Sequence, residues 1–313
     1  MNTRRYQLRF SGLRENKGRI KVATLQCSLD ALVKTAECAT RLMVTGEGSG
    51  RGPRPGWLNA ALDFTITGGE LGSTIFEIEA PQLDETAYVR FAQQNFWREE
   101  TIMQDTAVDL AALSIQEAQE TTSSGDYFDR AVLSAILRFR QPTVNANICY
   151  HLIPQESDYG EFTLDASVCN RIENRLKSLP PSRAFIISGW IEEIKQDGGR
   201  FFLELGDGRK MFGRLQSDQL DVEQLRPLWG KRATVQGMVH FKANGQPRLI
   251  EAYRLRPYQD RDAIFEELPS TEMPKSRGLT RRQEKQARSF NVLSLCGTWP
   301  GNEPVEELLA QLD

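Results

Sequence analysis

The 313-residue sequence lacks several features that would assign it to a class at once. No apolar stretch approaches the ~20 residues that a membrane-spanning helix requires, so we expect no membrane association. The five cysteines are odd in number and show no C-x-x-C spacing, which favours a reduced, cytoplasmic protein in which each thiol is a small buried side chain. The net charge of −3 gives no overall sign of nucleic-acid binding, although this sum averages over domains and does not test local patches.

Recognised catalytic motifs are missing as well. The sequence contains no H-E-x-x-H, no G-x-S-x-G and no paired His–Cys motif. Its only two histidines, His151 and His240, fall in predicted strands, where a lone histidine is usually structural. Carboxylates at helical spacing, such as Asp105 and Asp109, are explained by helix caps and solvated helix faces. We therefore predict no catalytic residue, no metal site and no cofactor, and expect a protein that is not an enzyme. A site hidden in the N-terminal domain is the alternative.

Residues 1–178 mix helical and strand patterns and predict an α+β domain. Tyr6, Leu8 and Phe10 alternate with polar residues, which predicts a first strand and not a signal peptide. The further elements expected are one or two helices over 20–43, a hairpin over 60–80 with its turn at Gly68-Gly69, helices near 103–119 and 126–139, strands near 147–153 and 160–164, and a helix over 165–177 capped by Asp165.

The segment 46–56 is rich in glycine and proline, which predicts a surface loop. A phosphate-binding loop is the alternative interpretation. The segment has no G-K-[S/T] sequence, however, and no buried strand leads into it. We therefore expect a connection that binds no ligand.

After the break at Leu179-Pro-Pro, residues 183–257 become rich in strands. Three strands, one helix and two strands are expected in that order, which is the order of an OB-fold. The segments Gly189–Ile194 and Gly199–Gly208 resemble the first hairpin of OB barrels from several nucleic-acid-binding families. A small SH3-like barrel fits the strands nearly as well. The expected strands cover 185–194, 200–205, 210–215, 231–241 and 247–253, with the helix over 217–228.

Side-chain alternation divides the predicted barrel strands into an inner and an outer face. The outer face combines three aromatic residues with one arginine, a set that could stack bases and hold phosphates: Trp190, Phe202, Phe212 and Arg214. The alternative is that this face packs against the N-terminal domain, and Glu192 and Glu204 on the same face would repel a nucleic-acid backbone. The inner face carries Phe185, Ile187, Ile191, Phe201, Leu203, Leu205, Met211 and Leu215.

Residues 258–289 form a polar linker that becomes basic toward its end. Between Lys275 and Arg288 there are six basic residues and one acid, Glu284. Arg281 and Arg282 in this run are candidate nucleic-acid contacts. A solvated helix face explains the same charge pattern.

Residues 290–313 form an amphipathic tail with more apolar side chains than so short a segment can bury by itself. Its last residues, from Glu303, predict a short acidic helix with leucines on one side. Such a helix is too short to be stable alone and becomes ordered when it docks into a groove. The tail is therefore expected to bind a partner protein; folding back onto its own chain is the alternative.

The run from Leu293 to Leu309 resembles the toxin-binding tail of VapB-type antitoxins, in which a short L-x-G-x-W segment and an acidic helix lie in the groove of a PIN-domain ribonuclease. The resemblance covers about 20 residues. It implies an antitoxin-like component of a bacterial toxin–antitoxin or antiviral (phage-defence) system, with a nucleic-acid-binding protein as the alternative function. The implied partner-binding residues are Leu293, Leu295, Trp299, Glu303, Glu306, Leu308, Leu309 and Leu312.

Overall fold

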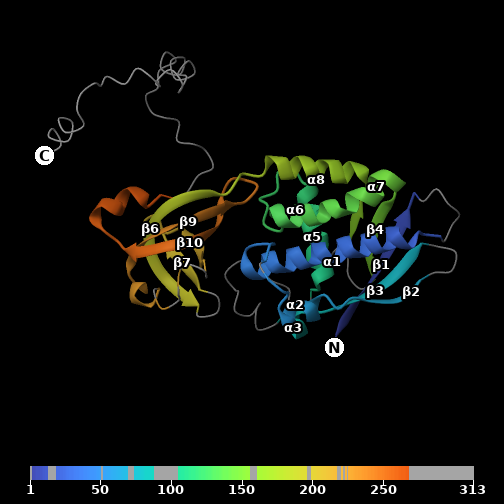
Figure 1. Ribbon diagram of the computed structural model, residues 1–313, viewed down its shortest axis with the longest axis horizontal. Coiled ribbons are helices and arrows are strands. Elements are labelled where there is room, and N and C mark those ends of the chain that lie inside the picture. Colours follow the sequence, from blue (N-terminus) through green and yellow to red (C-terminus); the bar gives the residue numbers. More distant parts are fainter. Residues whose placement is uncertain are drawn as a thin grey trace, which may run out of the picture. The chain divides into compact units, whose positions relative to one another are not determined.

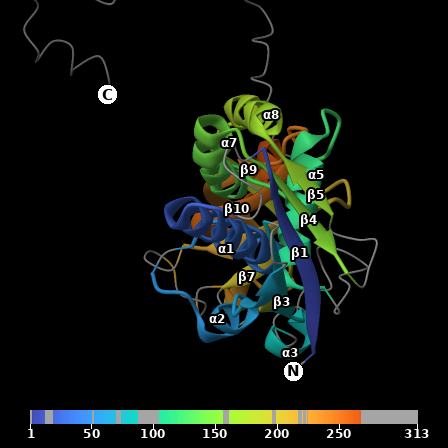
Figure 2. The same ribbon diagram turned by 90° about the vertical axis from the view of Figure 1, so that its right-hand side faces the viewer.

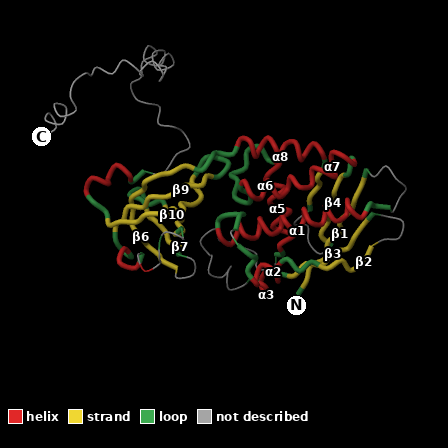
Figure 3. The backbone as a smooth tube through the Cα atoms, in the orientation of Figure 1, coloured by secondary structure: helices red, strands yellow, loops and turns green. Residues whose placement is uncertain are grey.

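The structure is a computed structural model that describes residues 2–12, 19–50, 52–69, 74–87, 105–155, 161–195, 199–216, 220, 223 and 225–267. The chain divides into two units, Met1–Thr271 and Glu272–Asp313. The first unit begins with an α+β domain and continues with a closed five-stranded β-barrel, so the expected α+β class is confirmed (Figure 3). In the described part of the chain, no helix is both long enough and apolar enough to cross a membrane.

Five antiparallel strands form the sheet of the α+β domain, in the order β2-β3-β1-β4-β5. The first strand lies in the centre because two long partners flank it: Leu8 pairs with Phe76 of β3 on one side and with Leu152 of β4 on the other. The strands are β1 (Thr3–Ser11), β2 (Thr65–Gly69), β3 (Ile75–Pro81), β4 (Cys149–Pro154) and β5 (Phe162–Leu164).

Helices cover one face of this sheet, as Figures 1 and 2 show. Tyr6, Leu8 and Phe10 point from β1 into a core that the helices complete, as their alternation predicted. The single long helix α1 packs against α5 and α6 across this core. The helices are α1 (Val22–Thr45), α2 (Gly56–Ala61), α3 (Leu83–Thr86), α5 (Ala107–Gln119), α6 (Arg130–Ile136), the 3-10 turn η1 (Leu137–Phe139), α7 (Arg140–Ala146) and α8 (Ala166–Ser178).

A buried polar network ties β1 to the start of α5. Thr106 caps the helix and forms a capping box with Asp109, whose carboxylate accepts from the Thr106 backbone at 2.9 Å. The fully buried Asp109 also pairs with Arg4 at 2.9 Å, and the Tyr6 hydroxyl lies 2.6 Å from the Thr106 hydroxyl. Burial raises the pKa of Tyr6, and burial together with Asp109 raises the pKa of Asp105 to about 6.

Several expectations for this domain need correction. Gly68 and Gly69 pair with β3 and belong to β2, so they do not form the turn that was expected at them. The hairpin expected from residue 60 begins only at Thr65, because Ala61 still belongs to α2 and Leu62 is buried at the C-terminal end of that helix. Of the loop expected over 46–56, the described residues 46–50 and 52–55 form no helix or strand, whereas Gly56 begins α2. Asp165 caps α8, as expected, by accepting from the Val168 amide at 2.8 Å.

The barrel closes in the order β10-β8-β7-β6-β9. Every neighbouring pair is antiparallel except β8 with β10, which is parallel. Numbered within the barrel, the order is 1-2-3-5-4-1, the Greek-key connectivity of an OB-fold. The strands are β6 (Arg183–Lys195), β7 (Arg200–Glu204), β8 (Lys210–Leu215), β9 (Arg232–Phe241) and β10 (Pro247–Pro257), with 3-10 turns η3 (Arg226–Leu228) and η4 (Asp260–Phe265).

The inner face of the barrel is the one that alternation predicted. Seven of the eight residues expected inside are buried, and Phe185 is partly buried against the same core. Leu225 and Leu228 also pack into this core. The helix expected over 217–228 lies partly outside the described residues, and its described C-terminal end is the 3-10 turn η3.

Candidate functional site

The outer face of the barrel holds the four residues that were predicted to bind nucleic acid, but their environments differ. Trp190 is 47% exposed, whereas Phe212 is buried and packs edge-on against the half-buried Phe202. Arg214 forms ion pairs with Glu47 of the α+β domain at 2.8 Å and with Glu251 of β10 at 3.0 Å. The structure therefore does not bring the four together as one exposed stacking platform.

The remaining charges on this face are of both signs and are engaged with neighbours. Arg200, opposite Arg214, donates to the Val44 carbonyl, and Arg232, opposite Trp190, pairs with Glu266. Glu192 and Glu204 share a hydrogen bond, and Lys210 pairs with Glu192 at 2.5 Å. The bond to Glu192 and its charge raise the pKa of Glu204. With Arg214 already held by two glutamates, this region presents little free positive charge to a phosphate backbone.

The barrel contacts the α+β domain through β10 and the loop that precedes it. Arg248 is buried, and its guanidinium donates to the backbone carbonyls of Gly125, Asp126 and Phe128. Lys242 pairs with the Asp126 carboxylate at 2.7 Å. In OB-folds the loop between the last two strands commonly binds ligands, whereas here its described contacts hold the two domains together.

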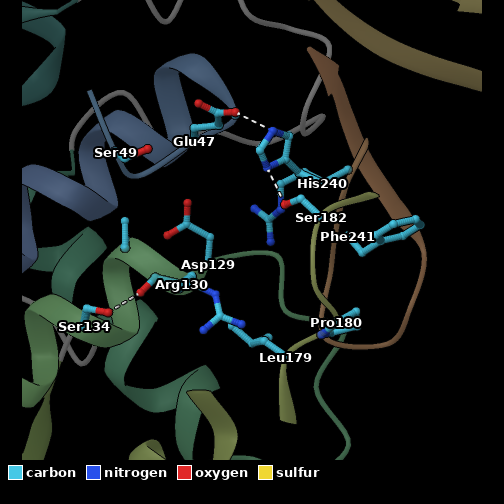
Figure 4. A pocket seen from close by; sticks show the side chains of 13 residues that line it. Glu47, Ser49, Asp129, Arg130, Ser134, Leu179, Pro180, Ser182, His240 and Phe241 are labelled. Carbon is cyan, nitrogen blue, oxygen red and sulfur yellow. Dashed lines mark hydrogen bonds and ion pairs between the residues drawn. The ribbon is translucent and has the colours of Figure 1, made fainter. Parts of the chain in front are cut away.

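The two domains also meet around His240, which faces Glu47 in Figure 4. Glu47 lies just beyond the C-terminus of α1, and its Oε1 atom is 3.2 Å from His240 Nε2. The second glutamate, Glu251, has its Oε2 atom 3.9 Å from the same nitrogen. Arg214 binds the other oxygen of each glutamate, and the Ser182 hydroxyl lies 3.0 Å from His240 Nδ1. This cluster could hold a cation, since its three facing atoms all lie within 4.8 Å of one another.

A cavity of about 330 Å³ opens beside this cluster. Figure 4 shows Glu47 and His240 on one wall, and Asp129 and Arg130, at the N-terminal end of α6, on another. Its lining also includes Arg248, so the cavity combines groups of both charges from the two domains. The Asp129 carboxylate already has two partners: it caps α6, and it accepts a hydrogen bond from the Gly48 amide at 2.6 Å.

Two tryptophans lie exposed on a different part of the barrel. Trp229 is 66% exposed, forms a bridge with Ile191 and donates its indole N–H to the Glu192 carbonyl at 2.9 Å. Trp190, next to Ile191 in the chain, pairs across the strands with Arg232. The two tryptophans are therefore attached to adjacent backbone, in a region where Arg232 also stacks on Tyr258.

The predicted partner-binding residues lie outside the described part of the chain. The same holds for Arg281 and Arg282, the candidate nucleic-acid contacts of the linker. The residues concerned in the tail are Leu293, Leu295, Trp299, Glu303, Glu306, Leu308, Leu309 and Leu312.

Sequence reasoning treated the two histidines alike, and the structure separates them. His151 lies in β4 of the sheet, where it contacts Ser11, Cys149 and Thr163. His240 instead faces Glu47, which is far from it in the sequence, and Glu251 on the neighbouring strand β10. No spacing motif joins these residues, and the segment containing Glu47 was expected to be an unliganded loop. Only the barrel topology, with β9 beside β10, gave a hint that His240 and Glu251 would be neighbours.

Comparison with known proteins adds no family to this description. No protein-family model matches the chain, and no curated protein matches its sequence significantly.

Proposed function

We propose that this chain is a protein-binding component whose residues 290–313 engage a partner protein, in the manner of the antitoxin tails that they resemble. The observation that supports this proposal is the completeness of the barrel before the tail begins. Strand β10 closes the barrel against β8 and β9, and the described barrel core is built from residues between Phe185 and Leu255. The barrel therefore closes with its own five strands and needs no strand from residues 290–313.

The partner class follows from the chemistry of the tail. Leucines and one tryptophan suit an apolar groove, and the nearby glutamates suit a basic rim around it. A PIN-type ribonuclease fits this description, since a groove that binds RNA is basic. In such a pair, the tail would restrain the nuclease and the folded unit would carry the tail.

Replacing Leu295 and Trp299 together by alanine should weaken partner binding about 1,000-fold, because two buried apolar anchors each contribute roughly 2 kcal/mol to such an interface. The chain is coexpressed with the proteins encoded beside it, and binding is measured by co-purification and then by titration. The matched control is Ser294→Ala with Thr298→Ala, which changes two neighbouring polar positions. Co-purification of an equally bound partner by residues 1–289 alone would refute the proposal.

Single-stranded nucleic acid is a second candidate ligand, supported by the exposed Trp190 and Trp229 on an OB-type barrel. Trp190→Ala should then weaken binding of a labelled oligothymidylate about 10-fold, because stacking contributes about 1–3 kcal/mol per base. Ile264→Ala is the control, since this side chain is also apolar and 77% exposed. Fluorescence anisotropy at two salt concentrations measures the effect. Unchanged affinity in Trp190→Ala would remove this candidate.

A further inference from the structure

We propose that Glu47, His240 and Glu251 form a binding site for a divalent transition-metal cation, with Zn²⁺ as its best-fitting probe. The facing atoms are His240 Nε2 and the two carboxylate oxygens next to it, Glu47 Oε1 and Glu251 Oε2. One imidazole nitrogen and two carboxylate oxygens form a donor set that Zn²⁺ accepts, and three protein ligands leave a coordination position open.

The spacing of the three atoms suits such an ion. Zn²⁺ bound to nitrogen and oxygen at about 2.0–2.1 Å places neighbouring ligand atoms about 3.3 Å apart in a tetrahedral site. His240 Nε2 lies 3.2 Å from the Glu47 oxygen and 3.9 Å from the Glu251 oxygen. All three ligand atoms lie within 4.8 Å of one another, so closing the site requires side-chain movements on the order of an ångström.

Two of the three atoms are buried polar atoms that lack a hydrogen-bond partner among the described residues. They are Glu47 Oε1 and His240 Nε2, which lie close to each other. A buried polar atom without a partner is costly, and a shared cation satisfies both atoms at once.

Arg214 and Ser182 contact the three proposed ligands and would form the outer coordination shell of the ion. Arg214 binds Glu47 Oε2 and Glu251 Oε1, so it orients both carboxylates and leaves their other oxygens facing His240. The Ser182 oxygen can accept from His240 Nδ1–H, which leaves the lone pair on Nε2 for a metal.

The charges of the cluster also favour a cation. Two carboxylates and one guanidinium sum to −1 with a neutral imidazole, and a divalent ion changes this to +1. The open coordination position is expected on the side of the neighbouring cavity, which Glu47 and His240 both line. Because Glu47 belongs to the α+β domain and the other two ligands to the barrel, the ion would also clamp the two domains together.

The test is calorimetric titration of the EDTA-treated full chain with ZnCl₂ at neutral pH. We expect one zinc ion per chain and a rise in Tm on binding. Loss of an outer-shell partner typically lowers metal affinity roughly 10–100-fold, and we expect Ser182→Ala to lower zinc affinity by an amount in that range. His240→Gln and Glu251→Gln each remove a ligand atom and should lower zinc affinity by more than that. His151→Gln is the matched control and should bind zinc as the wild type does.

Two results would overturn the site. If wild-type protein bound no zinc, the three side chains would only contact one another and would not form a metal site. If both His240→Gln and Glu251→Gln bound zinc with wild-type affinity, the ion would lie elsewhere. Circular dichroism establishes that each variant is folded, and the two ligand variants keep the test decisive if one of them fails to fold.

Discussion

Replacing Arg248 by methionine should cost roughly 3 kcal/mol or more of the free energy of unfolding and should uncouple the barrel from the α+β domain. The buried guanidinium donates to the carbonyls of Gly125, Asp126 and Phe128. Methionine fills a similar volume but donates nothing, so these acceptors lose a charged donor in a buried place. Few single substitutions leave as many buried groups without a partner.

Urea unfolding gives the free energy, and hydrogen exchange resolved by mass spectrometry separates the two domains. In the variant, we expect faster exchange in β10 and at the start of α6 than in the sheet of the α+β domain. Arg254→Met is the control, because Arg254 is exposed on the same strand and should change stability by no more than about 0.5 kcal/mol. Equal stability of the Arg248 and Arg254 variants would show that this contact does not hold the domains together.

Arg4→Met should destabilise the α+β domain by about 3–5 kcal/mol, the usual cost of removing one partner of a buried ion pair. Arg4 is only 14% exposed, and its partner Asp109 is fully buried with Asp105 nearby. Without the guanidinium, two carboxylates remain close together in a low-dielectric environment. The adjacent Arg5→Met is the matched control, because its pair with Glu79 is at the surface and should contribute less than about 1 kcal/mol.

The cost of Arg4→Met should depend on pH. Because burial and Asp109 raise the pKa of Asp105 to about 6 from its usual 3.8, the folded chain binds a proton that the unfolded chain has released between these values. The stabilising contribution of this group is complete below about pH 4 and is lost as the pH rises through about 6. The loss caused by Arg4→Met should therefore be larger at about pH 8 than at about pH 5, as thermal unfolding would measure. A loss that is equal at both values would contradict this account.

Periodicity along the chain predicted most of the secondary structure, because the burial of one face imposes a local pattern. The alternation of Tyr6, Leu8 and Phe10 placed β1, and the apolar spacing over 20–43 placed α1. The order of strands and turns predicted an OB-type barrel, whose closed topology the structure confirms. The hairpin turn near Gly69 was misplaced, because glycine is compatible with a strand as well as with a turn.

The candidate site could not be predicted in the same way. Trp190, Phe202, Phe212 and Arg214 share an outer face by alternation, but alternation does not say which part of that face a second domain covers. The contact between Arg214 and Glu47 joins residues from different domains, and no local pattern encodes it.

The sequence by itself determined which side chains point into each core, since a period of two or 3.6 residues distributes them over the faces of a strand or helix. It also led to the prediction that residues 290–313 bind a partner protein, which the described residues do not test. Only the tertiary structure decided that Arg248 joins the two domains and that Glu47, His240 and Glu251 meet at one point. The physical reason is that such contacts depend on the docking of two finished surfaces, which no periodicity within either domain records.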